Sequence, residues 1–420
     1  MEYLAIASFA ALLATSYRAE RNLLYPPNLF NGTWLAAMVG ILLSGDTLYE
    51  ISGFTYMVYL VGALSISLGG VVGLRLVESR PQRRHEVIPR KRSRWVYRAL
   101  IVCLAILVVG LPLYWQEVVS VADDVADDLL LQNLRYKAVE ASDEVATFGI
   151  LGNFVVVAQF VAAAMYYELD GSRLRRWLAS CAVIVALIYG GMTGTKGNAV
   201  VLLVGLLFVS AVKQRKMHVG PILFTLVSAL ALFSFGLVVI NFAYETSSDT
   251  LDLFIRMTEA IQSYWLGGFV GFDQIAHDPS IVESTQPIYR FVLDTARNLG
   301  MGVYAPPTHA QYLSISPTMD TNTFTIYFSY FKEFGWIGTV VIMFGLGMFL
   351  ALTYRNAMKG GAVWSIFFAN MCTALVFTFH GEHFFLGING YAKLMVFLTV
   401  IYKILPILER RSSTERLSRA

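Results

Sequence analysis

Charge and cysteine are both scarce in this chain. Charged residues make up 15% of its 420 positions, whereas hydrophobic residues make up 56%. This composition excludes an ordinary soluble domain, and the long apolar runs predict transmembrane helices. All three cysteines fall inside these runs, so we expect neither a disulfide framework nor a cysteine-based metal site. They are Cys103, Cys181 and Cys372.

Several sequence signatures are also missing. The first apolar run begins at Tyr3 without a basic segment before it or a small-residue cleavage site after it, so we expect no cleaved signal peptide. There is no P-loop, no dinucleotide-binding fingerprint and no Ser-His-Asp signature in a strand–turn–helix context. The apolar runs show no tandem repeat, which argues against an inverted-repeat transporter. We expect no cofactor and no nucleic-acid partner.

The charges that are present are sorted by loop. Alternate loops between the apolar runs hold 24 of the 32 Lys and Arg but 7 of the 29 Asp and Glu. The remaining loops hold 8 Lys and Arg and 22 Asp and Glu. The side with the basic loops therefore carries a net charge of +17, and the other side carries a net charge of −14. Because Lys and Arg are retained on the cytoplasmic side of inserted helices, the basic loops are predicted to be cytoplasmic. The acidic loops are then predicted to face outward.

The predicted fold class is an all-α polytopic integral membrane protein with about 11 transmembrane helices. A helix needs roughly 20 apolar residues to cross a bilayer. An odd number of spans with a basic cytoplasmic tail places the N-terminus outside. The expected spans lie near residues 2–17, 28–47, 53–76, 98–116, 146–168, 176–192, 198–213, 219–243, 336–354, 362–380 and 389–407.

We expect one membrane domain, residues 1–420, with three notable loops. Residues 75–98 form a basic cytoplasmic loop, and residues 117–145 form an acidic outer loop. Residues 244–335, between the eighth and ninth spans, form a much larger outer loop. Loops longer than roughly fifteen residues are usually functional or disordered, and this one holds too many aromatic side chains for disorder. It is expected to form a structured lid.

Outer cations are candidates for binding an anionic headgroup. Lys196 lies in a glycine-rich break, Thr193-Gly-Thr-Lys-Gly197, which predicts a hairpin between two spans. A lysine that merely snorkels to the interface explains this position equally well. Arg290 and Arg297 are seven residues apart, so two turns of helix place them on one face. Arginine binds phosphate in a bidentate manner, and a diphosphate requires two or more such groups.

Arg256 belongs to an amphipathic helix that is expected to start near Thr250. Asp252 and Glu259 lie on the same polar face, four residues before and three residues after the arginine. Two interpretations therefore stay open. Arg256 either contacts a phosphate or forms surface ion pairs with these carboxylates.

Histidines on the outer side are candidates for proton transfer. His309 follows two prolines in Pro306-Pro-Thr-His309, which favours a fixed position, although a plain surface histidine is the commoner case. His380-Gly-Glu-His383 does not match the spacing of a zinc protease and lacks a third ligand, so no metal site is predicted.

Residues 321–338 carry the most specific pattern in the chain. The segment Thr321-Asn-Thr-Phe-Thr-Ile-Tyr-Phe-Ser-Tyr-Phe-Lys-Glu-Phe-Gly-Trp-Ile-Gly338 suits an interfacial aromatic belt. It also resembles the Asn-x-Tyr/Phe-Thr…Tyr-x-Asp-Phe-Gly-x-x-Gly block of Wzy-type O-antigen and repeat-unit polysaccharide polymerases, with Glu333 in place of aspartate. The Lys196 hairpin resembles that family's small-Gly-Ser-Arg-Gly turn, and Arg256 with Gly267 resembles its Arg-x10-Gly motif. The matching positions of the block are Asn322, Thr325, Tyr330, Phe334, Gly335 and Gly338.

The resemblance implies a glycosyltransferase of GT-C-like architecture in the bacterial inner membrane. It would transfer a growing glycan from undecaprenyl diphosphate to the acceptor sugar of a new lipid-linked repeat unit at the periplasmic face. Cations must then neutralise the leaving diphosphate, and a base must accept the hydroxyl proton. The resemblance also implies a metal-independent reaction and a partner protein that regulates chain length.

This chemistry assigns expected roles to the candidate residues. The expected diphosphate-binding residues are Arg256, Arg290 and Lys196, with Arg297 in reserve. The expected base is His309, with Glu333 as the alternative. The expected substrate contacts are Asn322, Tyr330 and Tyr264.

Two other functions stay open at this point. An O-antigen ligase, which transfers finished glycan to the lipid A core, would share the span count and the large outer loop, and the 321–338 block favours the polymerase over it. A lipid-linked oligosaccharide flippase would require charged residues at mid-depth in the spans, whereas these are almost free of charge.

Overall fold

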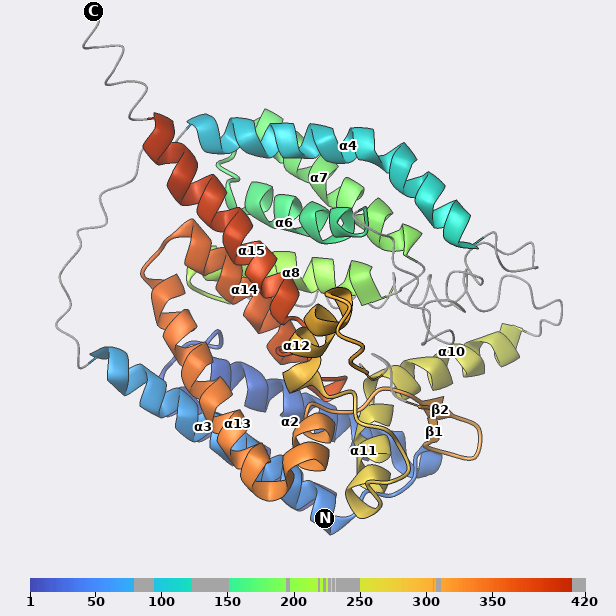
Figure 1. Ribbon diagram of the computed structural model, residues 1–420. Coiled ribbons are helices and arrows are strands. Elements are labelled where there is room, and N and C mark those ends of the chain that lie inside the picture. The colour runs from blue at the N-terminus through green and yellow to red at the C-terminus, as the bar shows by residue number, and fades with distance from the viewer. Residues whose placement is uncertain are drawn as a thin grey trace, which may run out of the picture. The chain divides into compact units, whose positions relative to one another are not determined.

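A computed structural model describes residues 1–78, 94–122, 151–193, 197–217, 250–304, 306 and 311–409, with six further residues between 218 and 249 (Figure 1). It is 79% helical. By length and composition, eight helices in this part of the chain can cross a membrane, which agrees with an all-α membrane protein. They are Pro26–Thr47, Gly53–Leu76, Arg94–Ser120, Arg173–Met192, Gly197–Gln214, Tyr327–Met358, Ala362–Phe379 and Ile388–Glu409.

These eight helices correspond to eight of the eleven expected spans. Residues 2–17 lie in α1 (Glu2–Ala19), which is helical but is not among the eight. Residues 146–168 overlap α6 (Asn153–Tyr167), a shorter apolar helix of 15 residues. Most of residues 219–243 lie outside the described residues, as do most of the loops 75–98 and 117–145. The count of eleven stays a prediction.

The chain forms two compact units, each built from segments that are distant in sequence. The first unit comprises Met1–Arg80, Tyr244–Arg355 and Met371–Asn389. The second comprises Pro81–Ala243, Asn356–Asn370 and Gly390–Ala420.

In the second unit, α6 is the central helix. It packs against α4 (Arg94–Ala122), α7 (Arg173–Met192) and α8 (Gly197–Gln214), and its run of alanines lets these helices approach closely. Helix α7 ends at Met192 and α8 is described from Gly197, on either side of the expected break, and Lys196 itself lies outside the described residues. Parts of α14 (Ala362–Val376) and α15 (Ile388–Thr399), with the π-helical turn η4 (Val400–Ile404), complete the unit.

In the first unit, α1, α2 (Pro26–Ser44) and α3 (Gly53–Glu78) pack against one another, and a short 3₁₀ turn, η1 (Gly45–Thr47), follows α2. Helix α13 (Tyr327–Met358) crosses α3 with backbone against backbone. A methyl group on Gly69 would overlap the carbonyl group of Phe344, and one on Gly347 would overlap that of Ile66. Small residues at such crossings allow the close packing that holds membrane helices together.

An aromatic core surrounds Trp34 of α2. Its indole N–H donates to the Thr378 hydroxyl at 2.9 Å, so the one polar atom of the ring is satisfied inside the apolar core. The Tyr59 hydroxyl donates to the Phe269 carbonyl at 3.0 Å, and the Tyr327 hydroxyl donates to the Tyr59 carbonyl at 3.1 Å. These bonds connect the spans to the segment expected to be the outer lid.

That segment contains regular structure in its described part. It comprises three helices, α10 (Thr250–Trp265), α11 (Gly267–His277) and α12 (Pro287–Asn298), and a two-stranded hairpin, β1 (Leu313–Ser314) and β2 (Asp320–Thr321). The strands are antiparallel, with Leu313 opposite Thr321. A helix that starts near Thr250 was expected, and the described residues are helical from Thr250 to Trp265.

Candidate functional site

Two of the patterns that carry the resemblance meet in space. Gly267 begins α11, and a methyl group there would lie 2.8 Å from Ile315 and 3.0 Å from Thr321, the first residue of the 321–338 block. The block is also tied to the turn η3 (Phe377–Phe379), because the Ile326 N–H donates to the Thr378 carbonyl at 2.8 Å. The lack of a side chain at Gly267 is therefore required by packing.

Gly335 divides α13 into two arms. Its φ of 61° and ψ of −153° are incompatible with a continuous helix and are costly for any residue with a Cβ atom. The first arm ends at Phe334, and the second arm carries the long apolar run. Tyr330 and Glu333 are three residues apart on the first arm, so they share one face.

The Tyr330 hydroxyl donates to Glu382 Oε1 at 2.9 Å. Glu382 also accepts the backbone N–H groups of three residues in the turn that follows it, at distances of 2.7 to 3.0 Å. They are Phe384, Phe385 and Leu386. Burial raises the pKa of Glu382, and these donors oppose the rise because they favour the charged form. One carboxylate thus fixes the turn and anchors the block.

Two histidines flank this carboxylate. The rings of Tyr264 and His380 stack with centroids 6.3 Å apart, and those of His380 and His383 with centroids 6.0 Å apart. Burial, together with the proximity of His383, lowers the pKa of His380 to about 3. Burial lowers the pKa of His383 to about 4. Both imidazoles are therefore neutral at physiological pH.

Glu333 lies half-buried on the same face as Tyr330. Its Oε1 atom accepts a short hydrogen bond from the Ser284 hydroxyl, just before α12. Its Oε2 atom is buried and has no hydrogen-bond partner among the described residues. Glu333 and Glu382 lie within electrostatic range of each other. Ser284 therefore holds one oxygen of Glu333 in place, and the backbone N–H of Gln286 also interacts with the carboxylate.

Helix α12 brings the two predicted arginines together. Arg290 Nε lies 2.9 Å from Asp294 Oδ2, and Arg297 Nη2 lies 3.3 Å from Asp294 Oδ1. This confirms the expectation that they share one face. Arg290 is only 5% exposed, and its Nη1 donates to the Pro306 carbonyl. Arg297 is the more exposed of the two guanidinium groups.

The polar face of α10 is joined to the strand hairpin. Thr318 donates to Glu259 Oε1 at 3.1 Å, and Ser263 donates to the Asp320 carbonyl at 2.6 Å. Arg256 is half-exposed on the same helix. The side chain of Asp252 lies outside the described part of the chain.

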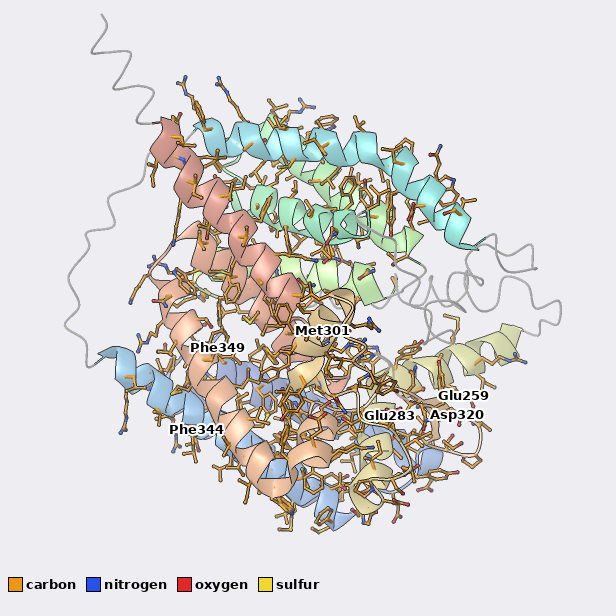
Figure 2. All side chains as sticks on the ribbon, viewed as in Figure 1. Glu259, Glu283, Met301, Asp320, Phe344 and Phe349 are labelled. Atoms are coloured by element: carbon orange, nitrogen blue, oxygen red, sulfur yellow. The ribbon has the colours of Figure 1, made fainter. Side chains whose placement is uncertain are left out.

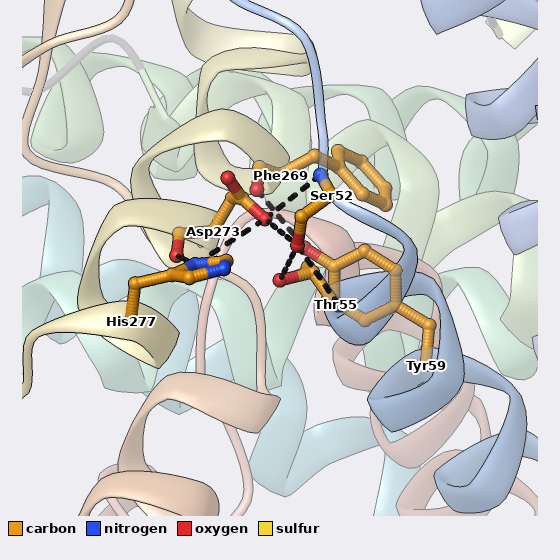
Figure 3. Close-up of polar contacts among 6 residues, drawn as sticks. All are labelled: Ser52, Thr55, Tyr59, Phe269, Asp273 and His277. Carbon is orange, nitrogen blue, oxygen red and sulfur yellow. Dashed lines mark hydrogen bonds and ion pairs between the residues drawn. The ribbon is translucent and has the colours of Figure 1, made fainter. Parts of the chain in front are cut away.

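A second polar cluster joins α3 to α11 (Figure 3). The Ser52 N–H and hydroxyl both donate to Asp273 Oδ1, at 3.0 and 2.6 Å, and His277 Nδ1 lies 3.9 Å from the same oxygen. Nucleophile activation requires the histidine between the serine and the acid, and here the acid lies between them. Ser52 also accepts the N–H of Thr55 at 3.3 Å, as a helix N-cap does. This cluster joins two helices and is not a catalytic triad.

We call the two carboxylates and the five side chains near them the acid–histidine cluster: Tyr264, Ser284, Tyr330, Glu333, His380, Glu382 and His383. Three of the predicted site residues, Tyr264, Tyr330 and Glu333, belong to it. Glu382 and Ser284 were not predicted, although the spacing of His380 and His383 had drawn attention to the segment. Among the described residues no group of three His, Cys, Asp or Glu is arranged to hold a metal ion.

The remaining predicted residues are distributed differently. Asn322, the second residue of the block, is half-exposed. His309 lies outside the described residues, as does Lys196. Their expected roles stay predictions.

No protein-family model, curated protein or solved structure matches this chain. Its helices and composition define the class: an all-α, multi-pass membrane protein.

Proposed function

We propose that the chain is a metal-independent glycosyltransferase that polymerises lipid-linked saccharide repeat units. The growing glycan is transferred from undecaprenyl diphosphate to the acceptor sugar of a new lipid-linked unit. The observation that carries this proposal is the placement of Tyr330 and Glu333, two residues of the 321–338 block. They share a helix face, and both are hydrogen-bonded to segments outside the block.

The proposed chemistry uses the unpartnered oxygen of Glu333. The acceptor hydroxyl oxygen forms a bond to the anomeric carbon, and the bond from that carbon to the diphosphate oxygen breaks. The diphosphate leaves with the bonding electrons, and the hydroxyl proton passes to Glu333 Oε2. Ser284 keeps the carboxylate oriented through Oε1. An oriented base of this kind contributes roughly 10²–10⁴-fold to rate.

The leaving diphosphate requires cationic groups. Arg297 and Arg256 are exposed enough to contact a phosphate, whereas Arg290 is buried against Asp294 and Pro306. We therefore assign direct contact to Arg297 and Arg256 and assign the positioning of α12 to Arg290. Lys196 and His309 keep their proposed roles as a further phosphate ligand and an alternative base.

The proposal also includes a location and partners. The chain would lie in a bacterial inner membrane with its N-terminus and the 244–335 segment on the periplasmic side. Its C-terminus would lie in the cytoplasm, as the sorted charges favour. Its partners would be the lipid-linked oligosaccharide, the surrounding lipid and a protein that regulates chain length.

Glu333→Gln tests the chemistry, because it preserves the shape of the side chain and removes its basicity. In a deletion strain complemented with this variant, we expect the ladder of glycan lengths on a gel to collapse to single repeat units at normal protein level. Glu283→Gln is the matched control, because Glu283 is an exposed carboxylate that accepts a hydrogen bond from Tyr304. A full ladder from Glu333→Gln would remove Glu333 as the base.

The deletion strain itself tests the class of function. Single repeat units on the lipid carrier support a polymerase. Full-length glycan that stays on its carrier indicates a ligase instead. Repeat units confined to the inner leaflet indicate a flippase.

A further inference from the structure

Helix α12 exposes an apolar face. Val292 and Leu299 are 64% and 74% exposed, and Met301, just past the helix, is 67% exposed. Tyr289 lies on the same face, because positions 289, 292 and 299 are separated by three and seven residues. Figure 2 labels Met301 beside α12. A surface helix of a soluble protein normally turns such a face towards the core.

The opposite face of α12 is polar and already has partners. It carries Arg290, Asp294 and Arg297, which are joined by the two ion pairs described above. The helix therefore separates charge from apolar surface, and the apolar side is the exposed one.

The C-terminus of α12 extends this apolar surface in a defined way. Gly300 has a φ of 76°, its N–H donates to the Arg297 carbonyl, and the Met301 N–H donates to the Ala296 carbonyl. This pair of bonds is a Schellman motif, which reverses the chain at a helix end. It holds Met301 beside the last turn, so the apolar surface does not depend on an unstructured tail.

The apolar face is continuous with the surface of a membrane-spanning helix. The ring of Tyr289 packs against that of Phe334 at 6.2 Å, at the end of the first arm of α13. Directly beyond the bend at Gly335, Ile337 is 81% exposed and Val341 is also exposed, both inside the Tyr327–Met358 span. Exposed apolar side chains on a helix that spans a membrane are expected to face lipid, because they gain nothing from water. The face of α12 begins where this lipid-facing surface begins.

We propose that α12 lies in the membrane interface, with its apolar face against lipid acyl chains and Arg297, the exposed arginine of the opposite face, towards the headgroups. Helices of this kind have one apolar face and basic residues on the other. The occupant of the exposed face is the bilayer, because the face adjoins the exposed apolar surface of a helix that is long and apolar enough to span it. The inference goes beyond the proposed function and does not depend on it. If both hold, Arg297 stands at the depth of a lipid diphosphate.

Spin-label accessibility in nanodiscs tests the proposal. In a chain whose three cysteines are replaced by alanine, single cysteines are introduced by Val292→Cys and Leu299→Cys and labelled with a nitroxide. Ile337→Cys is the lipid-exposed reference, and Ser280→Cys, in an exposed polar turn, is the water-exposed reference. We expect labels at 292 and 299 to collide more with oxygen than with a water-soluble nickel chelate, as at 337. At position 280 we expect the label to collide more with the nickel chelate than with oxygen.

Two results would overturn the proposal: a nickel preference at 292 and 299, or low collision rates with both reagents, which would mean that protein covers the face. Should the cysteine-free chain fail to fold, the unmodified protein is used with a carbene photolabel dissolved in the bilayer. Mass spectrometry should then find label in residues 287–304 but not in 278–284. The reverse distribution contradicts the proposal.

Neither measurement depends on glycan synthesis, so failure here and failure of the proposed function are distinguishable.

Discussion

At Glu382 a single carboxylate joins parts of the chain that lie 52 residues apart, because it accepts both the Tyr330 hydroxyl and three backbone N–H groups. Buried donors that lose their acceptor cost more than the bond itself contributes. This arrangement makes Glu382 a structural anchor and leaves Glu333, whose Oε2 atom has no hydrogen-bond partner among the described residues, as the candidate base.

Glu382→Gln should destabilise the protein more than Tyr330→Phe. An amide presents N–H groups to backbone donors and leaves them unsatisfied, at a cost of about 1–3 kcal/mol each, whereas Tyr330→Phe removes one bond worth about 1 kcal/mol. Thermal unfolding of both variants in detergent measures the difference. Equal midpoints, or a larger loss for Tyr330→Phe, would contradict the anchoring role.

The two histidines predict a loss of stability in acid. Burial lowers the pKa of His380 to about 3 and that of His383 to about 4, against 6.5 in the unfolded chain. Below pH 6.5 the unfolded state therefore binds more protons, so stability falls as the pH is lowered from 6.5 towards 4. The raised pKa of Glu382 acts in the opposite direction. As the pH falls, the folded protein binds a proton at Glu382 before the unfolded chain does, which favours the folded state.

Unfolding midpoints measured between pH 7 and pH 5 test the predicted direction in which stability changes with pH. The wild type should lose stability on acidification. A double variant, His380→Phe with His383→Phe, keeps aromatic rings beside Tyr264 and should show a flat or reversed slope. An unchanged acid-induced loss in that variant would assign the effect to other groups.

At the scale of elements, the crossing of α3 and α13 depends on glycine. Gly347 has no room for a methyl group beside the backbone of Ile66, whereas Gly345, two residues earlier, has open space. Gly347→Ala should therefore lower the unfolding free energy by about 1–3 kcal/mol or more, since the helices must move apart. Gly345→Ala should be neutral or stabilising, because alanine favours a helix over glycine by about 1 kcal/mol.

Thermal unfolding of this matched pair in the same detergent gives the comparison. Equal effects of the two substitutions would show that the helices do not cross with backbone against backbone. The sequence contains both glycines in the same run, and nothing in their spacing distinguishes the one that faces α3.

At the scale of the whole molecule, the sorted charges predict an orientation that cysteine labelling can measure. In a cysteine-free chain, Ser280→Cys should react with a membrane-impermeant maleimide added to intact spheroplasts. Lys216→Cys, in a basic loop, should react only after the membrane is permeabilised. The opposite pattern would invert the proposed topology and place the acid–histidine cluster on the cytoplasmic side.

Local patterns in the sequence were sufficient for much of the architecture. Eight long apolar helices, the break after α7 and a helix from Thr250 are all found in the structure, because apolar length and helical periodicity are properties of neighbouring residues. The spacing of Arg290 and Arg297 likewise determined that they share a face.

The tertiary structure alone decided which residues meet. Glu333 and Ser284 are 49 residues apart, and Glu382 finds its hydroxyl donor on a different helix. Such pairings depend on how helices cross and where Gly335 bends α13, and neither leaves a periodic signal in the chain. The sequence by itself determined a charge-sorted helical membrane protein. The division of its carboxylates into an anchor and a candidate base arose from burial and hydrogen bonding, which exist only once the chain is folded.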